Sequence, residues 1–134
     1  MRELHGHKVN PANDTLSIKV LDTPGAGNAC HLYQIDGFDT ESNASDPFVR
    51  RHGQSAQHAT VLFQNGPINE VGVNGVTHEA LIAIVIDRME SFQAGQFACP
   101  ENEIALGALR LAQRSLLLRT ELRMKRGVEG THAK

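Results

Sequence analysis

The chain has 134 residues, a length that favours a single domain. Its net charge of −2 provides no overall attraction for DNA, and its two cysteines, Cys30 and Cys99, are too few for a disulfide framework. Because no N-terminal apolar segment resembles a signal peptide and no stretch is long enough to span a bilayer, we expect a cytosolic protein with free thiols.

The N-terminal half is predicted to be a small antiparallel β-sheet that follows a flexible arm. Residues 1–15 are polar and show no periodicity, so they are assigned to the arm. In residues 16–75 apolar and polar side chains alternate, and turn residues such as Asp22–Asn28 and Asn74–Gly75 separate the runs. Strands are predicted over 16–21, 30–38 and 59–64, with a short fourth strand over 68–73 and a loop over 39–57.

Residues 77–126 are predicted to form a helical hairpin. Thr77 is a suitable N-cap for the first helix, and Glu79 lies in its first turn. The apolar run 80–86 could be a buried strand by periodicity, but the segment is long enough to be a helix. Pro100 opens the second helix, which runs to about Arg126, where Gly127 is placed to end it.

The first of these helices is apolar on all sides, so it should be covered on several sides. In a chain this small, other subunits are the natural cover. The predicted fold class is therefore α+β, with a small N-terminal antiparallel sheet followed by two long antiparallel α-helices in a homo-oligomer. Residues 16–134 are expected to form one domain.

Basic residues gather near the end of the second helix on an otherwise acidic chain. Arg119, Arg123 and Arg126 share one helical face, with Thr120 beside them. Guanidinium groups bind phosphates in bidentate fashion, although a basic helix end can also merely complement the helix dipole. The scarcity of acids to pair these arginines shifts the balance modestly towards an anionic ligand, and both interpretations stay open.

Aromatic and amide residues near the connection between the helices could contact such a ligand. Phe92 and Phe97 could stack on a nucleobase, although packing in a core is the usual fate of phenylalanine. Asn102 could bind an adenine edge or only cap the helix. The glycine-containing tail 127–134 could place backbone N–H groups around a phosphate, or it could be frayed.

No catalytic or metal site is evident in the sequence. Gly25-Ala26-Gly27 lacks the third glycine and the following helix of a dinucleotide-binding fingerprint, and the seven histidines do not converge on metal-ligand spacing. No Cys–His or Ser–His pairing stands out, which favours binding over turnover. We therefore expect no enzyme, no catalytic residue, no metal and no cofactor.

Several short motifs occur together from about Leu16 to the C-terminus. They are Phe63–Pro67, Val71–Thr77, Ile86–Arg88, Phe92–Gly95, Phe97–Cys99, Glu101–Asn102, Arg119–Thr120 and Arg126–His132. Together they resemble the Thoeris anti-defence sponge proteins of bacteriophages, of the first type described.

The resemblance implies a sheet followed by two long helices, assembled as dimers and then as hexamers. It implies that the protein binds glycocyclic ADP-ribose, an immune signal made by bacterial TIR-domain proteins, in the cytoplasm of the bacterial host. The signal is held without degradation. Some members also hold cyclic trinucleotides of the CBASS defence at separate sites, as the related anti-CBASS sponges do.

The resemblance also implies roles for particular residues. Phe92 would stack on the adenine, and Asn102 would contact the base or the ribose. Arg119, Thr120 and Arg123 would contact phosphate or ribose groups, either in the same pocket or in a cyclic trinucleotide pocket at a symmetry axis. Two departures could alter ligand preference: Pro100 stands where relatives are expected to carry an arginine or another polar residue, and the histidine-containing arm is additional.

Three alternative functions stay open. The chain could be a small phage enzyme that cleaves the same signal, a nucleic-acid-binding regulator that uses Arg110–Arg126, or a purely structural oligomeric phage protein. The acidic remainder of the chain disfavours the regulator. The expected partners are therefore small nucleotide messengers and further copies of the chain, not nucleic acid or a membrane.

Overall fold

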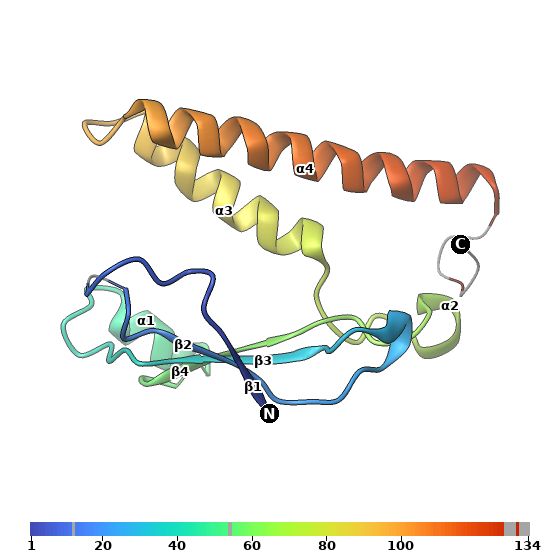
Figure 1. Ribbon diagram of the computed structural model, residues 1–134, viewed down its shortest axis with the longest axis horizontal. Helices are drawn as coiled ribbons and strands as arrows, with labels where there is room; N and C mark the ends of the chain where they lie inside the picture. Colours follow the sequence, from blue (N-terminus) through green and yellow to red (C-terminus); the bar gives the residue numbers. More distant parts are fainter. Residues whose placement is uncertain (12, 54, 128–130, 132–134) are drawn as a thin grey trace. The chain divides into compact units, whose positions relative to one another are not determined.

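The chain forms two compact units, Met1–Asn65 and Gly66–Lys134, in a computed structural model that describes residues 1–11, 13–53, 55–127 and 131. We call them the sheet unit and the helical unit (Figure 1). The sheet unit contains β1 (Arg2–Leu4), β2 (Ser17–Val20), the 3₁₀ turn η1 (Ala26–Asn28), β3 (Leu32–Asp36), α1 (Asp46–Arg51) and β4 (His58–Leu62). The helical unit contains α2 (Ile68–Val71), α3 (His78–Gln93) and α4 (Pro100–Lys125). The predicted α+β class is confirmed.

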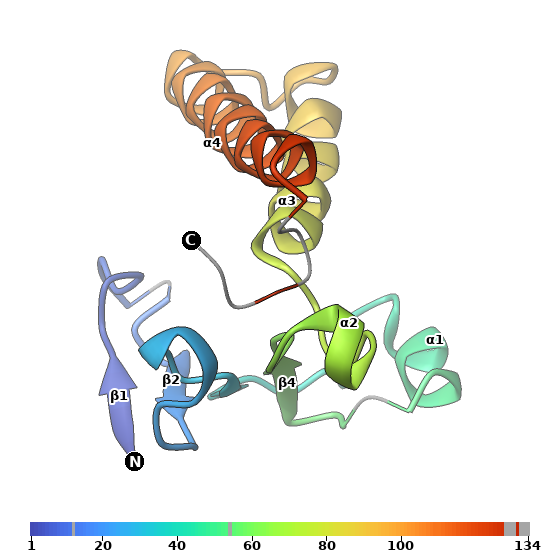
Figure 2. The same cartoon turned by 90° about the vertical axis from the view of Figure 1, so that its right-hand side faces the viewer.

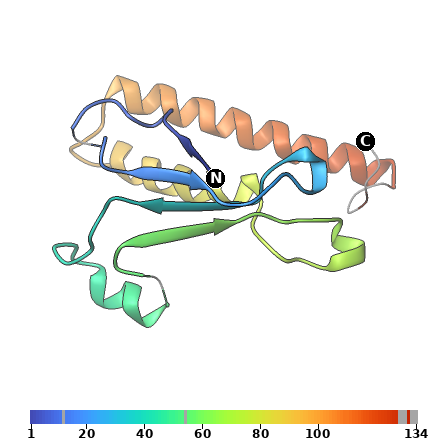
Figure 3. The same ribbon diagram turned by 60° about the horizontal axis from the view of Figure 1, so that its bottom comes forward.

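The sheet unit is built on a four-stranded antiparallel sheet with the strands in chain order. Figure 3 shows β2, β3 and β4 side by side. Val20 is the most buried core residue, at 1% exposure, whereas Lys19 on the opposite face forms an ion pair with Asp36 at 3.0 Å. Directly opposed residues share a face, so the alternating pattern separates an apolar side from a polar side. One cross-strand row contains Leu4, Ile18, Ile35 and Ala59, and the row beside it on the other face contains Glu3, Lys19, Gln34 and Thr60.

The segment 1–15, predicted to be a flexible arm, contains strand β1, which pairs with β2. His7 Nε2 also lies 2.8 Å from the Leu16 carbonyl oxygen. Gly37, at φ +89°, approaches Thr15 so closely that a Cβ there would lie 1.7 Å from the Thr15 carbonyl oxygen. The strand was missed because three residues are too few to display a periodicity.

Two segments predicted to be irregular or extended contain short helices. The predicted loop 39–57 contains α1, where the hydroxyl of Thr40 donates to the carboxylate of Asp46 in the first turn. The predicted strand over 68–73 is wrong, because Ile68–Val71 forms the short helix α2. Gly72, at φ +74°, ends that helix by donating its N–H to the Ile68 carbonyl at 2.8 Å. One helical turn is too short to be distinguished from a strand by its apolar pattern.

The starts of both long helices and the end of the second lie within a residue of their predicted positions. The Thr77 hydroxyl accepts the Ala80 N–H at 3.2 Å and caps α3, Pro100 opens α4, and Gly127 at φ +72° follows its end. Glu90 of α3 pairs with Arg110 of α4 at 3.2 Å. Figures 1 and 2 show α3 beside the first part of the longer α4.

The connection between these helices is held by side chain–backbone bonds. Gln93 donates to the Cys99 carbonyl at 3.3 Å and accepts the Cys99 N–H at 3.1 Å. It also donates to Glu103 at 3.0 Å. Ile86 and Leu106 are buried, and they form the apolar centre of the hairpin.

The carboxylate of Asp22 organises the loop between β2 and β3. It accepts the N–H groups of His31 at 2.9 Å and Leu32 at 3.1 Å. Partial burial acts to raise the pKa of Asp22, but the N–H donors of Leu32 and His31 outweigh it, so this pKa lies below its ordinary value of 3.8. A group with a lowered folded-state pKa stabilises the fold above its ordinary pKa, and that contribution is lost as the pH falls through the lowered value.

Asp22→Asn is therefore expected to lower the thermal unfolding midpoint at neutral pH, because an amide oxygen carries no charge for these two N–H groups. The deficit relative to wild type should shrink as the pH falls below 3.8. Circular dichroism melts across the acid range measure both effects. Asp14→Asn, an exposed acid of the same unit, is the matched control. A deficit that is the same at every pH would contradict the prediction.

Candidate functional site

Phe92 and Asn102 lie close together around the connection between α3 and α4. The rings of Phe92 and Phe97 are 6.3 Å apart between centroids and nearly perpendicular, at 77°. Asn102, in the first turn of α4, donates its amide N–H to the Phe97 carbonyl oxygen at 3.5 Å. The hairpin geometry therefore brings together one of the two predicted groups of ligand-binding residues.

A surface depression of ≈ 590 Å³ surrounds this aromatic pair, and we call it the hairpin-end depression. Its volume falls in the range of small-molecule sites. The guanidinium carbon of Arg88 lies over the Phe92 ring, 5.1 Å from its centroid. Asn102 is not among the residues that line it, although it supports Phe97. The lining residues are Ile84, Asp87, Arg88, Ser91, Phe92, Gly95 and Phe97.

Sequence reasoning did not assign Asp87, Arg88 or Ser91 to a site. A signal was present, because Arg88 and Phe92 are four residues apart in α3, as are Asp87 and Ser91, and such pairs share a helical face. The apolar run 80–86 that precedes them is typical of a helix that packs in a core.

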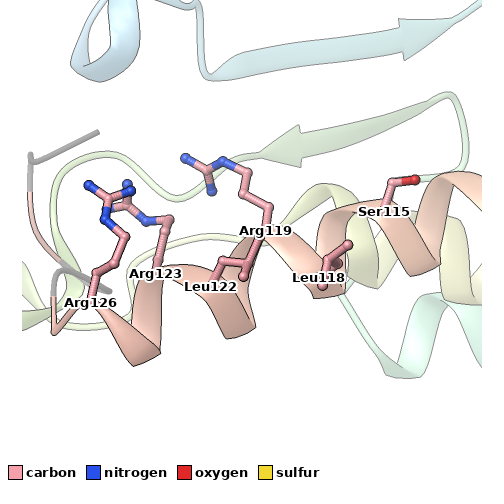
Figure 4. A pocket seen from close by; sticks show the side chains of 6 residues that line it. All are labelled: Ser115, Leu118, Arg119, Leu122, Arg123 and Arg126. Carbon is pink, nitrogen blue, oxygen red and sulfur yellow. The ribbon is translucent and has the colours of Figure 1, made fainter.

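A second depression, of ≈ 450 Å³, lies along the end of α4, and we call it the arginine depression. Arg119, Arg123 and Arg126 extend from one side of the helix in a similar direction (Figure 4). The described residues that line it include no acid. They are Ser115, Leu118, Arg119, Leu122, Arg123 and Arg126.

The predicted residues of this second group differ in their surroundings. Arg123 is only 8% exposed, and it donates to the Thr131 carbonyl oxygen at 3.1 Å. It therefore ties part of the tail to α4, in addition to lining the depression. Arg119 is exposed, whereas Thr120 is half-buried and is not among the lining residues. Of the predicted ligand-proximal tail 127–134, only Gly127 and Thr131 lie within the described residues.

The two depressions are separate within one chain. Asn102 and Arg119 are joined by continuous helix α4, and a rise of about 1.5 Å per residue separates them by about 25 Å along its axis. A single pocket that contains Phe92, Asn102 and Arg119 would therefore need residues from two chains. A separate pocket for the arginines needs no such sharing.

The described residues hold no group of three or more His, Cys, Asp or Glu side chains that could bind a metal ion. Within the described part of the chain, no helix has the length and apolar character needed to cross a membrane.

Part of the chain, including α3 and the start of α4, is similar to a known protein family. The family described as "Acb2/Tad1, hairpin domain" matches residues 55–114, which include α2, α3, the hairpin-end depression and the first part of α4. The match ends before Arg119. Residues 55–114 of this chain are thus similar to the Acb2/Tad1 hairpin domain.

A particular relative supports the same assignment. The chain is 53% identical over 76 residues to Thoeris anti-defense 1 of Bacillus phage SBSphiJ7. The matched region covers 57% of this chain and 54% of that relative, so the chain spans about half the length of the curated protein it matches. The resemblance to the phage Thoeris anti-defence family is therefore confirmed.

Proposed function

We propose that this chain is a phage anti-defence protein that sequesters glycocyclic ADP-ribose in the host cytoplasm and releases it chemically unchanged. The family supports an anti-defence role, because the relative named above is a Thoeris anti-defence protein. The observation that carries the choice of ligand is the hairpin-end depression, where Phe92, Phe97 and Arg88 offer aromatic surface and a cation at one place.

The chemistry of such a signal fits this depression. Glycocyclic ADP-ribose is a rigid ring with a purine and two phosphates, and a rigid ligand loses little entropy when it binds. An aromatic ring can stack on the purine, and a guanidinium group can bind phosphate oxygens in bidentate fashion. Binding of this kind needs no catalytic group and no cofactor.

The arginine depression supports a second ligand class within the same proposal. Three guanidinium groups on one helical face suit a compact ligand with several phosphates, and a cyclic trinucleotide has three. Because about 25 Å of helix separates the two depressions, the two ligands would bind independently. We propose that Phe92 and Asn102 serve the ADP-ribose-type ligand and that Arg119, Thr120 and Arg123 serve the cyclic trinucleotide.

Homo-oligomerisation, as dimers that form hexamers, completes the proposal. Large apolar side chains are exposed on both long helices, and Ile84 at 66% and Ile104 at 73% are examples. Each such side chain contributes about 1.5–3 kcal/mol when it is fully buried. The other large apolar side chains exposed on these helices include Val85, Leu111, Leu117, Leu118 and Leu122.

Incubation followed by recovery of the ligand tests this function against its alternatives. The full chain is mixed with glycocyclic ADP-ribose, separated from free ligand by gel filtration, heated and extracted. Intact ligand in the extract supports sequestration, whereas ADP-ribose-like products indicate the small enzyme. Salt-sensitive binding of DNA or RNA would indicate the regulator. An assembled protein that binds no nucleotide would indicate the structural role.

A further inference from the structure

We propose that Arg88 is the anion-binding residue of the hairpin-end depression, where it contacts the diphosphate of an ADP-ribose-type ligand. This inference rests on the proposed function, because it assigns a further residue to the same site. It goes beyond the roles of Phe92 and Asn102, which concern the base and the ribose.

The position of Arg88 is defined by the ring beside it. Its guanidinium carbon lies 5.1 Å from the centroid of Phe92, within the distance of about 6 Å at which a cation is attracted to an aromatic face. Phe97 meets the same ring nearly edge-on, at 77°. The Arg88 side chain is therefore held at the ring on which the purine is expected to stack.

A guanidinium group that lies over an aromatic ring still has N–H donors available to bind an anion. Five N–H bonds are arranged around its planar rim, so contact with an aromatic ring leaves several of them to meet phosphate oxygens. In ADP-ribose-type molecules a ribose joins the adenine to the diphosphate. A cation beside the stacked base is consequently within reach of that diphosphate.

The charges that line the hairpin-end depression make phosphate binding there depend more strongly on Arg88. Among the described residues that line the depression, Arg88 is the only cation and Asp87 is the only acid. Their formal charges cancel, in contrast to the three arginines of the arginine depression. A phosphate that enters the hairpin-end depression thus meets one cationic lining residue, and loss of that residue would leave the carboxylate of Asp87 as the only charged lining group.

The test is calorimetric titration of the full chain with glycocyclic ADP-ribose at low and physiological ionic strength. Arg88→Gln is expected to raise Kd about 10- to 100-fold, which is typical for loss of a hydrogen bond to a charged group. Its binding should also become less dependent on salt, because one charge pair has been removed. Arg88→Lys should have an intermediate effect, since it keeps the charge but not the planar fork.

Arg114→Gln is the matched control, because it makes the same charge change on α4 outside the residues that line either depression. Its Kd should stay within about twofold of wild type. Arg88→Gln and Arg88→Lys should keep wild-type melting curves and assembly state, and unchanged binding of a cyclic trinucleotide.

Three results would decide against the role of Arg88. Equal binding by wild type and Arg88→Gln would overturn this inference alone. Weaker binding with an unchanged salt dependence would mean that Arg88 only positions Phe92. Loss of both ligands would mean that Arg88 maintains the fold of the hairpin and is not specifically an anion-binding residue. If the wild type binds no glycocyclic ADP-ribose at all, the proposed function fails instead.

Discussion

Phe92→Ala is expected to weaken binding of glycocyclic ADP-ribose by about one to two orders of magnitude while assembly stays intact. Base–aromatic stacking is worth about 1–3 kcal/mol per base, which corresponds to about 5- to 150-fold in Kd. The substitution also removes the ring that holds Arg88 at 5.1 Å and contacts Phe97. Calorimetric titration gives the affinity, and analytical ultracentrifugation gives the assembly state.

Asn102→Ala should also weaken binding of glycocyclic ADP-ribose, but for a different physical reason. Besides the proposed contact with the ligand, Asn102 supports Phe97 through the bond of its amide to the Phe97 carbonyl. Phe48→Ala, which truncates an exposed phenylalanine in the sheet unit, is the control and should bind normally. If Phe92→Ala and Asn102→Ala both bind as tightly as wild type, the ligand does not lie at the hairpin end.

The elements that could be predicted are those whose periodicity extends over enough residues. The alternating strands around Ile18 and Ile35 and the capped helices that begin after Thr77 and Cys99 agree with the structure. Local chemistry fixed their ends, because a hydroxyl cap, a proline in the first turn and a glycine at positive φ each act within a few residues.

The elements that could not be predicted are short or depend on distant contacts. Strand β1 exists through its pairing with β2, and α2 is a single turn between Pro67 and Gly72. Such features depend on tertiary contacts that a local pattern does not encode.

For the candidate site, the sequence does not show how the predicted residues are grouped in space. Phe92 and Asn102 are ten positions apart, yet the hairpin brings them to the same end. Asn102 and Arg119 are in one helix, yet its length keeps them apart. Arg88 belongs to the motif Ile86–Arg88 but was not assigned to a site, because its proposed role depends on its contact with the Phe92 ring.

The separation of the two depressions leads to a prediction for Arg119. Arg119→Ala is expected to weaken binding of a cyclic trinucleotide by about 10- to 150-fold, the range for a hydrogen bond to a charged group worth about 1.5–3 kcal/mol. Arg119 is exposed and lines the arginine depression, so its loss should leave the fold and the assembly state unchanged. Binding of glycocyclic ADP-ribose should not change, because the hairpin-end depression is about 25 Å away along α4.

Arg123→Ala is a useful comparison, because Arg123 is buried and bonded to Thr131, and its loss should reduce thermal stability as well as binding. Arg114→Ala removes an exposed arginine outside the lining residues, so it should change neither thermal stability nor binding.

Titrations of all three variants with both ligands, together with sedimentation, separate the possible outcomes. If Arg119→Ala weakens both ligands equally, the arginines of one chain complete the hairpin-end depression of another, and the two-site proposal is wrong. If Arg119→Ala alters assembly, and neither the wild type nor the variant binds a nucleotide, these arginines stabilise a structural oligomer. A ligand-binding role requires that the affinity changes while the assembly state does not.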